Sequence, residues 1–138
     1  MLKIGETATF SKTITESDVY LFAGITGDFN PIHINEKEAQ KTIFKSRVAH
    51  GMLTGSFIST VLGTGVPGPG TIYLEQNLKF KKPVYINDTV TAKVTVLDIL
   101  NEEKGIYKLN TIILNGNEEV VTEGYAIVKY TSESELHE

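Results

Sequence analysis

Hydrophobic residues follow two different spacings along the 138-residue chain. In the first half they recur every three to four residues, as on one face of a helix, and after Gly70 they alternate with polar residues, as on one face of a strand. Residues 3–12, at the start, are predicted to form a short strand. A long run of strands after a buried helix predicts an α+β fold, in which an antiparallel sheet curls around that helix.

Two amphipathic helices are predicted in the first 50 residues. The first runs from a capping residue at Thr15 to about Thr26, just before a glycine that can end it in the left-handed conformation. The second is short, begins at the cap Asn35, and is expected to turn Ala39 and Ile43 inward.

A third helix, over about 50–62, has apolar or small residues on nearly every side, and a helix without a charged face is expected to be buried all round. These residues are Met52, Leu53, Gly55, Ser56, Phe57, Ile58, Val61 and Leu62. From Val48 to Gln76 the only charged residue is Glu75, but the glycines, serines and threonines in this run make it too polar for a membrane span.

The second half is predicted to be antiparallel sheet. Apolar residues alternate in two runs: Ile72, Leu74, Leu78 and Phe80, and then Val90, Ala92, Val94 and Val96. Residues 106–114 and 118–130 form two further strands, joined by a hairpin at Asn115-Gly116-Asn117. We expect a single domain over residues 1–138, of which 131–138 form a frayed tail.

Composition excludes several classes of function. The net charge of −4 argues against nonspecific nucleic-acid binding, which needs a basic surface. The absence of cysteine excludes a disulfide framework, a catalytic thiol and a cysteine metal site. The N-terminus lacks the apolar segment of a signal peptide, so a cytoplasmic location is the default expectation, with no membrane partner.

Candidate chemistry concentrates in the stretch 27–52. Asp28 precedes His33 by five residues, and Pro31 disfavours a helix through Asn30, so both side chains are expected on a shaped turn. An ordinary turn in which aspartate bonds the neighbouring backbone is the simplest alternative. An aspartate and a histidine held close together are also the groups needed to orient and deprotonate a water molecule.

Other polar residues in this region have plainer alternatives. His50 is expected either to cap the helix that follows or to hydrogen-bond in the core. With Asp28 and His33 it could instead form a metal triad, although nothing else in the chain has metal-ligand spacing. Ser59 lacks the surroundings of a catalytic nucleophile.

Basic residues recur at Lys37, Lys41 and Lys45, a spacing typical of a solvated helix face. The functional alternative is a basic rim that meets the phosphates of a nucleotide-bearing substrate. Arg47, the only arginine in the chain, is the strongest single candidate for that contact.

Residues 22–33 and 47–53 closely resemble the MaoC-like, (R)-specific enoyl-CoA hydratases. The most specific part of the resemblance is Asp-Phe-Asn-Pro-Ile-His at 28–33. The resemblance also includes residues 67–74 and 80–84 and so spans nearly the whole chain. The resemblance implies a hot-dog fold, an acyl-CoA thioester substrate and a homodimer with its sites at the interface. No metal or other cofactor is expected, because hydration of an activated thioester needs no metal.

The same resemblance implies roles for individual residues. Asp28 and His33 would be the catalytic pair, and Ser59 and Asn30 would lie with the substrate. The backbone N–H of Gly51, at the start of the central helix, can stabilise the thioester oxygen as negative charge develops there. Which of the two catalytic side chains protonates the α-carbon stays open.

Three functions are then in competition. The first is an (R)-specific enoyl-CoA hydratase, which converts trans-2-enoyl-CoA to (R)-3-hydroxyacyl-CoA or the reverse. The second is a thioesterase or a dehydratase of acyl-carrier-protein substrates, and the third is a non-catalytic acyl-CoA-binding module. The presence of both Asp28 and His33 favours the hydratase. The acyl chain is expected along the central helix, so that enlarging Ser56 or Leu62 changes chain-length preference.

Overall fold

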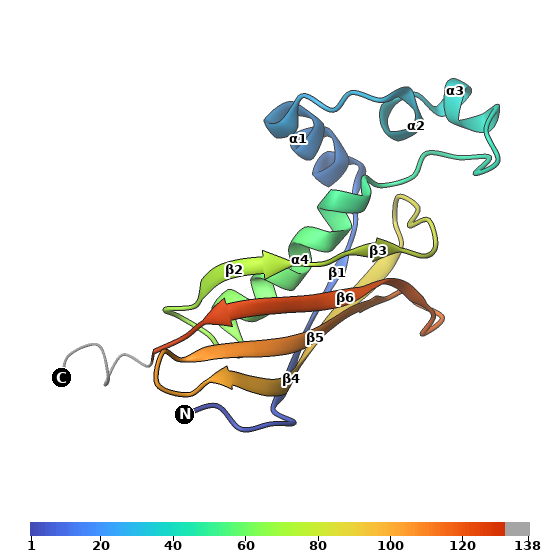
Figure 1. Cartoon of the computed structure of the whole chain (residues 1–138). Helices are drawn as coiled ribbons and strands as arrows, with labels where there is room; N and C mark the ends of the chain where they lie inside the picture. The colour runs from blue at the N-terminus through green and yellow to red at the C-terminus, as the bar shows by residue number, and fades with distance from the viewer. Residues whose placement is uncertain (132–138) are drawn as a thin grey trace.

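The computed structural model describes residues 1–131 and contains a six-stranded sheet with four helices (Figure 1). The strands are β1 (Thr7–Thr13), β2 (Ile72–Gln76), β3 (Lys79–Phe80), β4 (Thr89–Asn101), β5 (Ile106–Leu114) and β6 (Val120–Lys129). The helices are α1 (Glu16–Thr26), α2 (Pro31–Ile34), α3 (Glu36–Gln40) and α4 (Gly51–Thr64). Apart from Thr131, the predicted frayed tail lies outside the described residues.

The sheet is antiparallel, in the order β1-β4-β5-β6-β2, and β3 also pairs with β6. The predicted alternation is confirmed on β4, where Val90, Ala92, Val94 and Val96 are all buried. Helix α4 crosses one face of the sheet and contacts β4, β1 and β5 (Figure 1). The α+β arrangement expected from the sequence, a sheet around a central helix, is therefore confirmed.

Helix α4 is not buried all round. Ile58, Val61 and Leu62 pack into the core, but Met52 is 58% exposed, and Ser56 and Ser59 lie on the same uncovered side. The sheet covers only one side of the helix, so an apolar composition does not by itself bury the other side. Within residues 1–131, no helix is long and apolar enough to cross a membrane.

Strand β2 also differs from the expected regular alternation. Its pairing with β6 shifts register between Tyr73 and Glu75, and the chain reaches β3 only after a break at Asn77-Leu78. Ile72 and Leu74 are exposed. Tyr73 and Gln76 of β2 face the uncovered side of α4.

The first three helices gather at the N-terminal end of α4 (Figure 1). Thr15 and Asp18 form the predicted capping box of α1, and Gly27 ends the helix at φ 82°. A separate short helix, α2, then begins after Asn30, so the predicted break before His33 is confirmed.

The expected inward position of Ile43 is wrong. Ala39 is buried as predicted, but Ile43 is 86% exposed. Helix α3 ends at Gln40, and residue 43 lies in a turn that no longer follows the helical face.

Candidate active site

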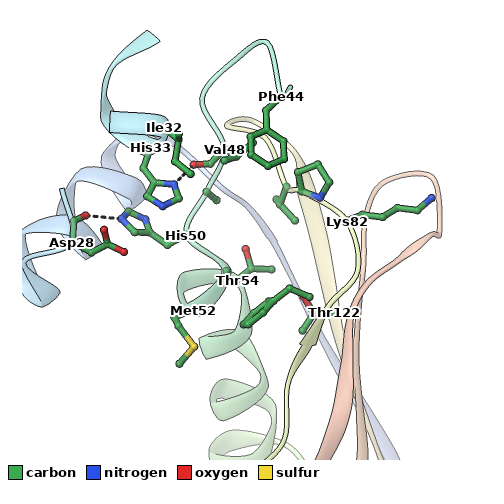
Figure 2. Close-up of a pocket in the computed structure, with 15 residues that line it drawn as sticks. Asp28, Ile32, His33, Phe44, Val48, His50, Met52, Thr54, Lys82 and Thr122 are labelled. Atoms are coloured by element: carbon green, nitrogen blue, oxygen red, sulfur yellow. Dashed lines mark hydrogen bonds between the residues drawn. The ribbon is translucent and has the colours of Figure 1, made fainter. Parts of the chain in front are cut away.

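A cavity of about 430 Å³ opens at the N-terminal end of α4 (Figure 2). One wall comes from α2 and the turn before it, and the opposite wall from β3, the loop after it, and β6. The lining residues are Asp28, Ile32, His33, Phe44, Val48, Ala49, His50, Gly51, Met52, Thr54, Phe80, Lys82, Pro83, Val84 and Thr122. The cavity thus contains the two predicted catalytic side chains and the predicted oxyanion donor in one mostly apolar space.

Asp28 lies on a tight turn and still lines the cavity. Its Oδ1 accepts a hydrogen bond from the Asn30 N–H at 3.2 Å, while its own N–H donates to Thr26 Oγ1 at 3.1 Å. The plain alternative, an aspartate turn, is therefore present. Because only Oδ1 takes part in that turn, the carboxylate keeps acceptor capacity toward the cavity.

His33 is 7% exposed, and its Nδ1 lies 2.6 Å from the carbonyl oxygen of Val48. A carbonyl oxygen can only accept, so Nδ1 carries the hydrogen and Nε2 of the neutral ring has a free lone pair. Burial lowers the pKa of His33, and the nearby His50 acts in the same direction. The Val48 carbonyl and Asp28 oppose this shift in the pKa but do not reverse it. His33 is therefore neutral at pH 7 and can accept a proton.

His50 is 2% exposed and contacts both Asp28 and His33. Its Nε2–H donates to the backbone oxygen of Asp28 at 2.9 Å, and its ring stacks on that of His33 with centroids 3.9 Å apart (Figure 2). No side chain caps the start of α4. Of the two plain roles expected for His50, capping is therefore wrong and hydrogen bonding in the core is confirmed.

Gly51 is the first residue of α4 and lines the cavity. The first N–H groups of a helix have no partner within the helix, and the helix dipole favours negative charge beside them. A Cβ at this position would lie 2.9 Å from Cε1 of Phe80. Glycine therefore allows the opposite wall to approach the backbone closely.

The three predicted substrate-binding residues do not line this cavity. The Asn30 side chain caps α2 by accepting from the Ile32 N–H at 3.2 Å. The Ser59 side chain lines a different cavity.

The Arg47 side chain binds side chains of α1 and α3. It donates to Glu36 at 3.0 Å, to Glu16 at 3.4 Å and to the Tyr20 hydroxyl at 2.7 Å. The guanidinium therefore joins α1 to α3. Its predicted phosphate contact stays a prediction.

The second cavity, of about 270 Å³, lies between the uncovered side of α4 and β2. It is lined by Met52, Gly55, Ser56, Ser59, Tyr73, Gln76 and Leu78. Met52 lines both cavities. The Tyr73 hydroxyl donates to Gln76, which in turn donates to buried Thr111 at 3.0 Å. Burial raises the pKa of Tyr73 to about 12, so its hydroxyl keeps its proton at neutral pH.

The possible metal ligands Asp28, His33 and His50 do lie together, each with one ligand atom within 4.8 Å of the others. Two ligand atoms on one tetrahedral zinc are roughly 3.4 Å apart, given bonds of about 2.1 Å. Nε2 of His50 is already bonded to the Asp28 backbone. An ion bound through this atom would therefore have to displace that hydrogen bond.

The sequence did not indicate that Thr54, Phe80, Lys82 and Thr122 line the cavity. Thr54 and Thr122 are buried and come from α4 and β6, and Phe80 comes from β3. The Lys82 ammonium at the rim is paired with Glu119. Phe80 and Lys82 belong to the family-like block 80–84, but no local pattern shows which of these residues meet the Asp28 turn, because packing of the sheet and α4 brings them there.

The family described as MaoC like domain matches residues 2–117. The chain therefore belongs to the MaoC-like family. An (R)-specific enoyl-CoA hydratase of Rhodospirillum rubrum is 55% identical over 127 residues, which cover 92% of this chain and 87% of that protein. A 3-hydroxybutyryl-CoA dehydratase of Methylorubrum extorquens is 44% identical, over 97% of this chain and 84% of that one.

This chain also resembles a solved structure of an (R)-hydratase. The (R)-hydratase of Aeromonas caviae involved in PHA biosynthesis superposes with a TM-score of 0.91, at 41% identity, covering 94% of this chain and 98% of that one. This MaoC-like chain therefore has the hot-dog fold expected from the sequence.

Proposed function

We propose that this MaoC-like protein is an (R)-specific enoyl-CoA hydratase, which reversibly adds water to trans-2-enoyl-CoA to give (R)-3-hydroxyacyl-CoA. The observation that carries the proposal is one cavity lined by the Asp28 carboxylate, the free Nε2 of neutral His33 and the start of α4. The activities named for the relatives agree with it.

The tautomer of His33 suggests an order of proton transfers. Asp28 orients a water molecule, and His33 Nε2 takes a proton from it while the water oxygen bonds to C3 of the substrate. The electron pair of the C2=C3 bond moves onto the thioester oxygen, which accepts a hydrogen bond from the Gly51 N–H. The enolate then collapses as C2 takes the proton from the His33 imidazolium, which returns both side chains to their starting states.

The size of each contribution suits this assignment. A positioned general base contributes about 10²- to 10⁴-fold, and one oxyanion donor about 10²- to 10³-fold. Neither contribution needs a metal, because the thioester already activates the double bond.

Turnover of crotonyl-CoA by the purified protein tests the proposal. Loss of the conjugated enoyl absorbance, with the (R)-alcohol as product, is expected for the wild type and lost in Asp28→Asn. Asp98→Asn is a matched control, because Asp98 is an exposed carboxylate on β4, outside the cavity. Release of free CoA would indicate a thioesterase instead. Binding without turnover, even of carrier-protein substrates, would indicate a binding module.

We further propose that two copies form a homodimer through β2, with the sites near the interface. Strand β2 is the last strand in the sheet order, so one of its edges has unpaired backbone groups among residues 1–131. Ile72 and Leu74 of this strand are exposed, and the uncovered side of α4 faces the strand at Tyr73 and Gln76. We expect a dimer mass in sedimentation for the wild type and a monomer for Leu74→Glu. A monomeric wild type would contradict this arrangement.

A further inference from the structure

We propose that His50 is a positioning residue, which joins the Asp28 turn, His33 and the start of α4 into one rigid unit. It is not itself a catalytic residue, because it acts through the two side chains that meet the substrate. The inference rests on the proposed hydratase function and adds a role for a residue that has none in the mechanism above.

The contacts of His50 reach each part of the catalytic centre. Its Nε2–H holds the backbone oxygen of Asp28 at 2.9 Å, its ring covers one face of His33, and the next residue in the chain is Gly51. The Phe22 ring of α1 lies 5.0 Å from the His50 ring, centroid to centroid. The imidazole is therefore packed between two rings and fixed by one hydrogen bond.

The hydrogen bonding of His50 also sets which ring nitrogen carries the hydrogen. The Asp28 carbonyl can only accept, so Nε2 holds the hydrogen and Nδ1 of the neutral ring has none. Nδ1 is buried and has no hydrogen-bond partner among the described residues. A residue that only filled space would need neither the hydrogen bond nor the polar ring.

His50 also shapes the surroundings of His33. The ionisable groups that face His33 are Asp28, from the preceding turn, and His50 itself, while Lys82 across the cavity is paired with Glu119. The His50 ring excludes water from one face of His33. It therefore adds to the burial that lowers the pKa of His33 and keeps that ring able to accept a proton.

Two substitutions of His50 each remove one of its two contacts, the hydrogen bond to Asp28 or the stacking on His33. His50→Phe keeps a ring over His33 but removes the donor to the Asp28 carbonyl, and His50→Gln keeps a donor but removes the ring. We expect both to lower kcat about 10- to 100-fold with little change in KM, since a misplacement of about 1 Å can cost about 100-fold. The acid limb of the kcat/KM profile should move to higher pH in His50→Gln, and move less in His50→Phe.

NMR titration gives a readout that does not depend on activity. The chain has only three histidines, and His33→Gln assigns the ring signals of residue 33. We expect the pKa of His33 to rise in His50→Gln more than in His50→Phe. In the wild type, the ¹⁵N shifts of His50 should show the Nε2–H tautomer.

Two results would overturn the role of His50. One is that both variants fold and keep the wild-type kcat and the wild-type titration of His33. The other, which needs no variant, is a wild-type His50 whose ¹⁵N shifts show the Nδ1–H tautomer. A wild type without hydratase activity but with the expected NMR behaviour would instead refute the proposed function and leave the contacts of His50 supported.

Discussion

The two cavities on either side of Met52 are built in different ways. In the first, Asp28 accepts a hydrogen bond from the Asn30 N–H, His33 donates one to the Val48 carbonyl, and a free helix N-terminus lies beside them. The second is formed by small side chains on the uncovered side of α4, facing β2. This difference fits the proposed function, in which the first cavity would hold the reacting groups and the second the acyl chain.

The largest expected effect comes from breaking the first cavity alone. His33→Gln removes the free Nε2 lone pair and should lower kcat about 10²- to 10⁴-fold, the contribution of a positioned general base. The residual activity should keep the wild-type preference among acyl chain lengths, because the second cavity is unchanged. Steady-state rates with substrates of several lengths, together with an unchanged Tm, check this. Near-normal turnover by the folded variant would refute the assignment.

A smaller effect should come from filling the second cavity. Ser56→Leu places a larger side chain in it, and we expect kcat/KM for an eight-carbon enoyl-CoA to fall about tenfold or more relative to crotonyl-CoA. The ratio of the two rates is the measurement. An unchanged ratio would mean that the acyl chain does not enter this cavity.

Leu62, the other position expected to set chain length, is a poorer probe. It is fully buried in the core and lines neither cavity. Enlarging it should therefore overpack the core, at a cost of about 1–3 kcal/mol in the free energy of unfolding.

The pH dependence of activity should report on the first cavity. Neutral His33 is the active form, so activity is lost as falling pH protonates it. Because burial lowers its pKa, the midpoint of that loss should lie below the ordinary histidine value of about 6.5. The kcat/KM profile measures this midpoint. A midpoint above that value would argue that His33 acts first as the acid.

The smallest expected effect is that of metal removal. The proposed reaction needs no metal, and Nε2 of His50 already bonds the Asp28 backbone, so dialysis against EDTA should leave the hydration rate unchanged. Rates before and after dialysis are compared directly. Lost activity that returns with zinc would favour the metal triad.

Much of the local structure could be predicted because neighbouring residues determine it. The capping box at Thr15, the left-handed Gly27 and the hairpin at Asn115-Gly116 each depend on a few adjacent positions. The alternation on β4 is equally local. Ile43 was misplaced because the end of α3, not its periodicity, decides where that side chain points.

The part of the candidate site that neighbouring residues determine could also be predicted from the sequence. The turn that carries Asp28 and His33 is contained within six consecutive residues, so the sequence alone determined its shape and its chemical content. Packing between distant segments decided the rest: His50 stacks on His33, Arg47 pairs with Glu36 and Glu16, and Phe80 closes against Gly51. Such contacts depend on how the sheet and helices come together in space, and only the tertiary structure holds that information.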